Sequence, residues 1–337
     1  MVQRRYRDAW RVATATFGAC SGSMTMRPTR RLLVLLAAAS LLTAIPAAPA
    51  GAKLKIGISE QNAGMFDSKY FTPLKIKYAR IVVPWNIMQR HDYWPGYLQA
   101  WLTGATKRHV EPHVAFNIID VAPKYFGKGP SVEAYAKMVK AFHRKYPQVR
   151  SFAPWNEENH QFQPTAKHPK LAAQYYRALR KACGSCRILA ADLLGDSNMK
   201  SWIRRFKRSY HGNATWGIHN YQDGNKPKAF KKTWTYLITK YVRGPIWSTE
   251  AGGIVGFKTV SGRVAYKYDL KRALRAQKRI FSLMTNPKVR RRYERVYIYN
   301  WFGSWTTKKR TNRWDSGLIA LNGKPRPTYY DLKRRTR

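Results

Sequence analysis

Acidic residues are scarce in this chain of 337 residues, which carries 17 Asp and Glu against 63 Lys and Arg. Such an excess of positive charge predicts attraction to polyanions and a strong dependence on salt. The partner classes it suggests are an anionic cell wall, an acidic polysaccharide and nucleic acid. The alternative is a general bias in surface composition, because the basic residues are spread along the chain rather than gathered in one tail.

A hydrophobic run long enough to cross a membrane is also missing. The longest apolar run, at residues 32–45, falls short of the roughly 20 residues that a transmembrane helix needs. Arginines precede it and small residues follow it, which is the order of a secretory signal peptide. We therefore expect residues 1–52 to be an N-terminal extension with a signal peptide, cleaved near residues 50–52. Residues 53–337 are then expected to be a single secreted, extracellular domain.

Cysteine is rare, and only Cys183 and Cys186 lie outside the predicted signal segment. A Cys-x-x-Cys pair is compatible with a redox site, half of a zinc site or a short disulfide. No second pair exists, and no histidine lies within a few residues, so a zinc site is not expected. Export favours a structural disulfide that ties a helix end to the next strand.

Short apolar strands alternate with amphipathic segments along the rest of the chain. Helical spacing of apolar residues appears at residues 132–142, 171–179 and 270–284. Strands are expected at residues 54–58, 79–84, 110–116, 150–155, 187–192, 215–221, 245–250 and 295–301. Eight such units predict an α/β fold, a single (β/α)₈ TIM barrel. A doubly wound open sheet is the runner-up, weakened by the lack of a Gly-rich loop after the first strand.

Polar and aromatic residues stand at the carboxyl ends of the predicted strands, where the chemistry of a barrel gathers. Residues 152–157 end on Asn156 and Glu157, and residues 246–250 end on Glu250. The other strand ends include Trp85, Asp192, His219, Tyr221 and Trp301. Hydrolysis of a glycosidic bond requires two carboxyl groups that face each other across a pocket. Amide, hydroxyl and indole groups around them suit the hydroxyls and faces of a sugar.

In order and spacing, these residues resemble the retaining glycoside hydrolases of the TIM-barrel clan A, which includes cellulase-like families such as families 5 and 39. The resemblance runs from about residue 54 to 332. It implies that Glu157, after Asn156 at the end of strand 4, is the acid/base. It also implies that Glu250, at the end of strand 7, is the nucleophile. The structural alternative for Glu157 is a helix-start carboxylate, with Glu158 as the fallback acid.

The same resemblance implies roles for the residues around the two glutamates. Arg80 resembles the clan arginine that steadies the nucleophile. His219 and Tyr221, expected on one side of strand 6, resemble the His-x-Tyr pair that contacts the nucleophile and its sugar. Trp301 resembles the tryptophan platform of strand 8, with Trp85 a further sugar-binding candidate and Asn156 a donor to a sugar hydroxyl. His113 sits too early to match a clan histidine and is left as a core or rim residue.

The sequence thus predicts a secreted enzyme, an O-glycosyl hydrolase that needs neither metal nor organic cofactor. Its expected substrate is a polysaccharide or oligosaccharide, and an anionic glycan is one candidate. The protein is also expected to associate with an anionic cell wall through its positive charge. No specific nucleic acid and no membrane span are expected, and the protein is expected to be a monomer. The alternative is a catalytically silent glycan- or polyanion-binding barrel associated with the wall. Transglycosylation by the same residues is a further alternative.

Overall fold

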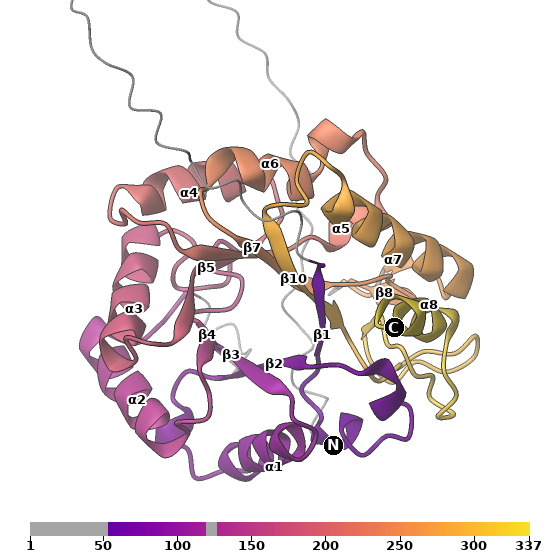
Figure 1. Cartoon of the computed structure of the whole chain (residues 1–337), viewed down its shortest axis with the longest axis horizontal. Coiled ribbons are helices and arrows are strands. Elements are labelled where there is room, and N and C mark those ends of the chain that lie inside the picture. The colour runs from indigo at the N-terminus through magenta and orange to yellow at the C-terminus, as the bar shows by residue number, and fades with distance from the viewer. Residues whose placement is uncertain (1–52, 119–126, 260) are drawn as a thin grey trace, which may run out of the picture.

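Eight parallel strands close into one barrel, and helices surround it (Figure 1). The computed structural model describes residues 53–118, 127–259 and 261–337. The neighbouring strands follow the order β1-β10-β7-β6-β5-β4-β3-β2. The barrel strands are β1 (Lys55–Ser59), β2 (Tyr78–Pro84), β3 (Glu111–Asn117), β4 (Ser151–Ala153), β5 (Arg187–Leu194), β6 (Thr215–His219), β7 (Ile246–Ala251) and β10 (Tyr293–Tyr299). The predicted (β/α)₈ barrel is confirmed, and the open doubly wound sheet is excluded because this sheet closes on itself.

Three of the barrel strands end earlier than predicted. All eight predicted strands are present, but β4 ends at Ala153, β6 at His219 and β10 at Tyr299, each two residues before its predicted end. The chain leaves the extended conformation at Asn220, where ψ is 32°. Tyr221 therefore begins a short helix, and the prediction that it shares one side of a strand with His219 is wrong. The predicted signal segment, residues 1–52, lies outside the described residues.

The helices pack outside the strands (Figure 1), and each predicted helical segment is confirmed. They are α1 (Trp94–Lys107), α2 (Val132–Lys145), α3 (Pro169–Ala182), α4 (Met199–Lys207), α5 (Tyr221–Asn225), α6 (Trp234–Tyr241), α7 (Leu270–Thr285) and α8 (Pro327–Arg335). Short 3₁₀ helices are η2 (Ala63–Met65), η3 (Thr72–Leu74), η4 (Ile87–Gln89) and η6 (Phe230–Lys232). Polar caps fix several starts: the side chain of Ser131 accepts from the Ala134 amide, and that of Asp269 from the Arg272 amide.

Side chains from the strands fill the barrel interior, so the barrel is a packed core and not a pore. The buried interior cluster consists of Val82, Ala115, Ala153, Leu189, Trp247 and Tyr297. His113 lies among them, with its Nδ1 2.8 Å from the Ser151 hydroxyl and its ring stacked on Tyr297. Burial and the charge of Arg80 lower the pKa of His113 well below its usual value. It is therefore a neutral core histidine.

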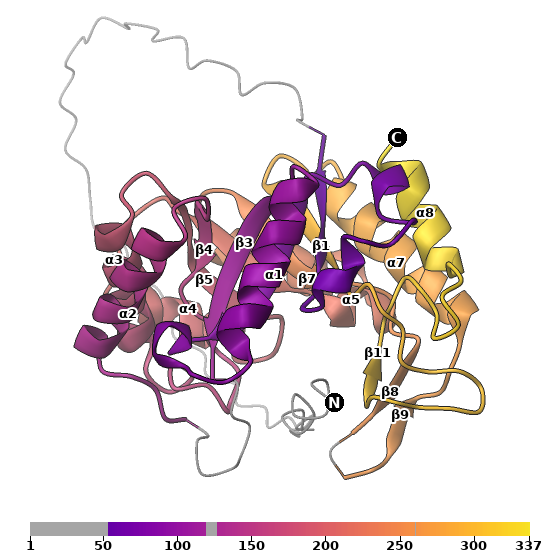
Figure 2. The ribbon, with the colours of Figure 1, turned by 90° about the horizontal axis from the view of Figure 1, so that it is seen from below.

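A second, three-stranded sheet in the order β11-β8-β9 lies beside the barrel. It is made of β8 (Gly256–Lys258), β9 (Val264–Tyr266) and β11 (Trp314–Asp315). Figure 2 shows it projecting at the end of the molecule toward which the barrel strands run. Strands of two or three residues carry no measurable periodicity, so the sequence gives no sign of this sheet.

Cys183 and Cys186 form a disulfide between the end of α3 and the start of β5, as predicted. Among the described residues, the helices are too short or too polar to cross a membrane. The part of the chain that the structure describes is thus one barrel with one small added sheet.

Candidate active site

Arg80 lies at the centre of a buried polar cluster at the carboxyl ends of the strands. Its guanidinium donates to Glu250 Oε1 (2.5 Å), Asn156 Oδ1 (2.6 Å) and Asp192 Oδ2 (2.8 Å). The Ser59 hydroxyl is a fourth partner at 3.2 Å. Burial alone would lower the pKa of Arg80, but the carboxylates of Glu250 and Asp192 more than reverse this and raise it. The cluster is therefore built around a permanent positive charge.

Glu250 lies near the end of β7 and receives hydrogen bonds on both carboxyl oxygens. Arg80 donates to Oε1, and the Tyr221 hydroxyl donates to Oε2 at 3.1 Å. Burial and the nearby charge of Glu250 raise the pKa of Tyr221 well above its usual value. Tyr221 therefore stays a phenol that donates to Glu250. Both oxygens of the carboxyl group are thus held by donors, and the residue is 8% exposed.

Glu157 stands in the loop that follows β4, with a left-handed backbone (φ 51°). Backbone hydrogen bonds tie its two neighbours to the adjacent strands. The Asn156 amide donates to Phe116 on β3, and the Glu158 amide donates to Asp192 on β5. The loop is thus held on both sides, and the carboxyl of Glu157 keeps a fixed position with 6% of the residue exposed.

His219 connects the two glutamates. Its Nδ1 lies 2.9 Å from Glu157 Oε1 and 3.7 Å from Glu250 Oε2. These two oxygens therefore lie no more than 6.6 Å apart, the sum of the two distances. Burial alone would lower the pKa of His219, but the charges of Glu250 and Asp192 raise it to about 10. The imidazole is then protonated at neutral pH, and both ring nitrogens donate.

Asp192, on β5, completes the cluster. Its carboxyl lies 3.5 Å from His219 Nε2 and accepts from the Thr249 hydroxyl as well as from Arg80. Burial tends to raise the pKa of Asp192, but the charges of His219 and Arg80 lower it below the usual value. The sequence marked Asp192 as a strand-end acid but assigned it no role. Its signal was an acid ending an apolar run, as for Glu157 and Glu250.

The two predicted tryptophans lie apart from this cluster. Trp301 is fully buried, and its ring packs edge-on against Phe71 and Tyr329 in the hydrophobic core. Neither face of its indole is open to a sugar in this structure. Trp85 is half-buried beyond the end of β2, where its amide donates to Asn117 and its side chain packs on the core.

Two aromatic residues that the sequence did not single out stand beside Tyr221 instead. The Tyr221 ring lies 6.3 Å from Tyr299 and 5.0 Å from Trp314, both edge-on. Trp314 belongs to β11, so the added sheet reaches the candidate site. No local pattern marks this residue, because its position depends on a contact between distant segments.

Two further acids near Glu157 have different environments. Burial raises the pKa of Glu158 well above its usual value, and the residue is fully buried. It is thus out of reach of a substrate. Burial and the charge of Glu157 raise the pKa of Asp196 to about 7, against hydrogen bonds that lower it. Its Oδ1 accepts from the Asn159 amide at 3.0 Å.

Within residues 53–118, 127–259 and 261–337, one group has the spacing of metal ligands: His143, Cys183 and Cys186, whose ligand atoms lie within 4.8 Å of one another. Both sulfur atoms are joined in the disulfide, which leaves one imidazole as a ligand. The group lies where β5 begins, whereas Glu157 and Glu250 lie where strands end. These residues do not fit a metal centre while the disulfide is intact.

Glycoside hydrolases are among the solved structures with a similar fold. A family 39 glycoside hydrolase from Bacteroides cellulosilyticus shares 13% identity at a TM-score of 0.60, over 84% of this chain and 63% of that one. The chain has the barrel fold of these glycoside hydrolases. A GH10 endoxylanase from a sugarcane soil metagenome matches with 13% identity and a TM-score of 0.58, over 85% of this chain and 97% of that one.

A β-glucuronidase from Bacteroides uniformis matches with 14% identity and a TM-score of 0.55. The match covers 85% of this chain but 35% of that enzyme, so the glycoside hydrolase barrel is only one part of some similar proteins. The sequence matches no protein-family model and no curated protein. At this level of identity the likeness establishes the fold, and the chemistry has to come from the residues of this chain.

Proposed function

We propose that this protein is a secreted retaining glycoside hydrolase, with Glu250 as nucleophile and Glu157 as acid/base. One observation carries the proposal: the single Nδ1 atom of His219 lies close to both carboxyl groups. Retaining enzymes keep their two carboxyls about 5–5.5 Å apart, and inverting enzymes about 6.5–9.5 Å apart. An upper bound of 6.6 Å between two oxygens supports the retaining geometry.

Glu250 has the environment that a nucleophile needs. In the first step its Oε2 forms a bond to the anomeric carbon while the bond to the leaving oxygen breaks. A carboxylate is required, and the donors Arg80 and Tyr221 stabilise that form. The carboxylate loses its negative charge as it forms the bond to the anomeric carbon. The same two donors stay in place during this step and need no reorganisation.

Glu157 has to give a proton in the first step and take one from water in the second. His219 supports both events. Its imidazolium stabilises the carboxylate that the second step requires, through the 2.9 Å contact with Oε1. In the first step Glu157 gives its own proton to the leaving oxygen, and the contact with His219 Nδ1 keeps its carboxyl in position. Asp192 keeps the positive charge on His219 and thereby orients the ring.

Asn156 is suited to bind the sugar. Its Oδ1 is occupied by Arg80, which fixes the orientation of the amide and leaves the Nδ2 hydrogens for a ligand. The side chain then donates to a sugar hydroxyl, an interaction that strengthens in an oxocarbenium-like transition state. Trp314 and Tyr299 extend the site with apolar ring surface next to Tyr221.

The substrate class is proposed from the similar structures. Their names specify xylan cleavage for one and β-glucuronide cleavage for another. Xylosides and glucuronides are therefore the first sugars to test for this chain. The predicted signal peptide supports an extracellular, glycan-containing setting.

The test is hydrolysis of aryl xylosides, glucuronides and glucosides by the full-length protein and by Glu157→Gln and Glu250→Gln. We expect turnover by the wild type and its loss in Glu250→Gln. An activated 2-fluoro glycoside should label the wild type once, with the added mass on the peptide that contains Glu250. Full activity of Glu250→Gln, or a label elsewhere, would refute the nucleophile assignment. Tight binding without turnover would instead favour the silent glycan-binding barrel.

A further inference from the structure

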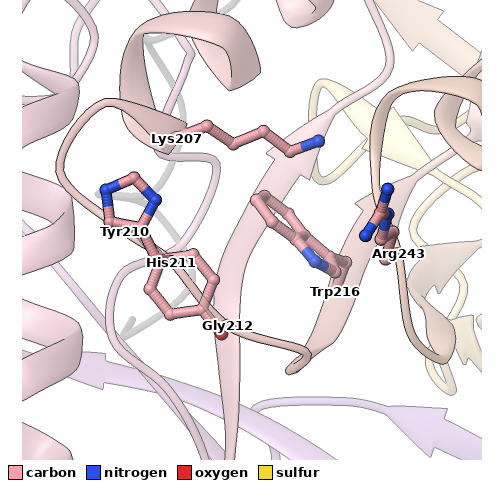
Figure 3. A pocket seen from close by; sticks show the side chains of 6 residues that line it. All are labelled: Lys207, Tyr210, His211, Gly212, Trp216 and Arg243. Atoms are coloured by element: carbon pink, nitrogen blue, oxygen red, sulfur yellow. The ribbon is translucent and has the colours of Figure 1, made fainter.

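A hollow of about 200 Å³ opens at the amino-terminal end of β6. It is lined by Lys207, Tyr210, His211, Gly212, Trp216 and Arg243. Figure 3 shows Lys207 reaching along one side toward Arg243, with Trp216 between them. Lys207 ends α4, Trp216 is the second residue of β6, and Arg243 precedes β7. The glutamates of the candidate active site stand at the opposite ends of these strands, so the hollow is a separate feature.

The positive charges of the hollow have no counter-charge. Its lining contains no carboxylate, and Lys207, His211 and Arg243 form no ion pair with any residue that the structure describes. Burial and the nearby charge of Arg243 lower the pKa of Lys207. Lys207 is the one lysine within the described ranges whose pKa is displaced in this way. Two like charges are thus held together at a cost that a bound anion removes.

The same residues present hydrogen-bond donors. Lys207 gives one of its three Nζ hydrogens to the Tyr241 carbonyl, which anchors the side chain. The indole N–H of Trp216, a residue that is 1% exposed, and the guanidinium of Arg243 donate to no described residue. The Trp216 ring is fixed in place because it packs edge-on against Phe206. The Lys207 and Trp216 donors are therefore fixed in position.

We propose that this hollow is a binding site for an oxyanion carried on a glycan, namely a phosphate, sulfate or carboxylate group. The charged donors and the indole N–H satisfy the oxygens, and the half-buried Tyr210 ring offers apolar surface to the attached sugar. A nucleic acid strand is a poorer fit, because it needs a row of contacts along its backbone. The net charge of +40 for residues 53–337 draws polyanions toward the protein, and the hollow holds one group in place.

The test is the affinity of the full-length protein for heparin, a sulfated glycan, and for polygalacturonate, a carboxylated one. Lys207→Gln/Arg243→Gln is compared with Lys308→Gln/Arg310→Gln, which removes the same charge from exposed positions before β11. We expect roughly tenfold or greater weakening for the first pair, as for the loss of a hydrogen bond to a charged group. The second pair should change little. Equal weakening would overturn the proposal, because general surface charge would then account for the binding.

Three further measurements test the source of the anion and the independence of its binding from catalysis. Titration with inorganic phosphate or sulfate should be saturable in the wild type and lost in Lys207→Gln/Arg243→Gln. An oligonucleotide that binds as tightly as heparin, and that loses affinity equally in the variant, would overturn the choice of a glycan. Turnover of an uncharged aryl glycoside should be unchanged in the variant. Because binding is measured directly, the result does not depend on whether Glu157 and Glu250 are catalytic.

Discussion

His219 faces three carboxylates at once, which no other residue of the candidate site does within the described ranges. Its two ring nitrogens divide the contacts: Nδ1 faces Glu157 and Glu250, and Nε2 faces Asp192. The sequence resemblance placed His219 beside the nucleophile, whereas its shortest carboxylate contact is with Glu157. This preference links His219 to the proton-transfer partner of the proposed reaction.

Stability should therefore decrease as pH rises from about 6.5 to about 10. The pKa of His219 is about 10 in the folded protein, compared with an ordinary value of 6.5 for a histidine in the unfolded chain. Protonation of His219 therefore favours the folded state. This contribution is complete below the lower value and is lost as pH passes the upper one. We expect the free energy of unfolding to fall by a few kcal/mol, roughly, across this window in the wild type.

The measurement is urea unfolding at several pH values for the wild type and His219→Gln. The variant should start less stable and show a flatter profile, because it lacks the titrating group. A wild-type stability that stays constant or rises between neutral pH and about pH 10 would contradict the assignment of a charged His219.

At the scale of elements, a glycine in β6 makes room for an acidic residue of the candidate site. Gly217 pairs with Asp192 on β5, and a side chain at Gly217 would collide with the Asp192 carboxyl. The glycine thus leaves room for the buried acid that contacts His219 and Arg80. An alternating strand pattern predicts β6 but does not explain this glycine, since the reason lies on the neighbouring strand.

Gly217→Ala should destabilise the protein by about 1–3 kcal/mol through overpacking, and should lower turnover by displacing Asp192. Gly96→Ala is the matched control, because a methyl group there meets no atom within 4 Å. Its effect on the free energy of unfolding should be about 1 kcal/mol or less, in the stabilising direction. Thermal unfolding and turnover of both variants check this, and equal effects would show that Gly217 has no special role.

The added sheet is predicted to take part in substrate binding through Trp314. Trp314→Ala should raise KM about threefold to tenfold, in line with the 0.5–1.5 kcal/mol of an aromatic contact. Trp301→Phe should leave KM unchanged and lower the free energy of unfolding by about 1–3 kcal/mol, because Trp301 is a core residue. Steady-state kinetics with a substrate that the wild type hydrolyses give the KM of both variants. A KM effect in Trp301→Phe alone would restore the platform role that the sequence implied.

At the scale of the whole molecule, residues 1–52 hold seven Arg and one Asp, which leaves +40 on residues 53–337. Charges at the surface interact over about 10 Å at 0.1 M salt, and less at higher salt. The local ion pairs of the candidate site are buried and much less screened. Salt therefore acts on the approach of a charged substrate rather than on the buried cluster.

Hydrolysis of an acidic polysaccharide should accordingly fall steeply with added salt, mainly through a rise in KM. Hydrolysis of an uncharged aryl glycoside should change little over the same range. Parallel assays at about 0.05 and 0.5 M salt give the comparison. Identical responses for the two substrates would show that the positive charge is a bias of surface composition and does not assist recognition.

The sequence by itself determined the barrel and the strand ends that carry the site. Alternating apolar strands and amphipathic helices specify local structure, and parallel strands bring their carboxyl ends together, so Asn156, Glu157, His219 and Glu250 were predictable as neighbours. Arg80, the third residue of β2, was found only through the resemblance to clan A. Tertiary structure alone decided the role of Asp192, the burial of Trp301 and the approach of Trp314. Those depend on contacts between segments far apart in the chain, and no local periodicity records them. The hollow between α4, β6 and β7 likewise exists only once the helices pack on the barrel.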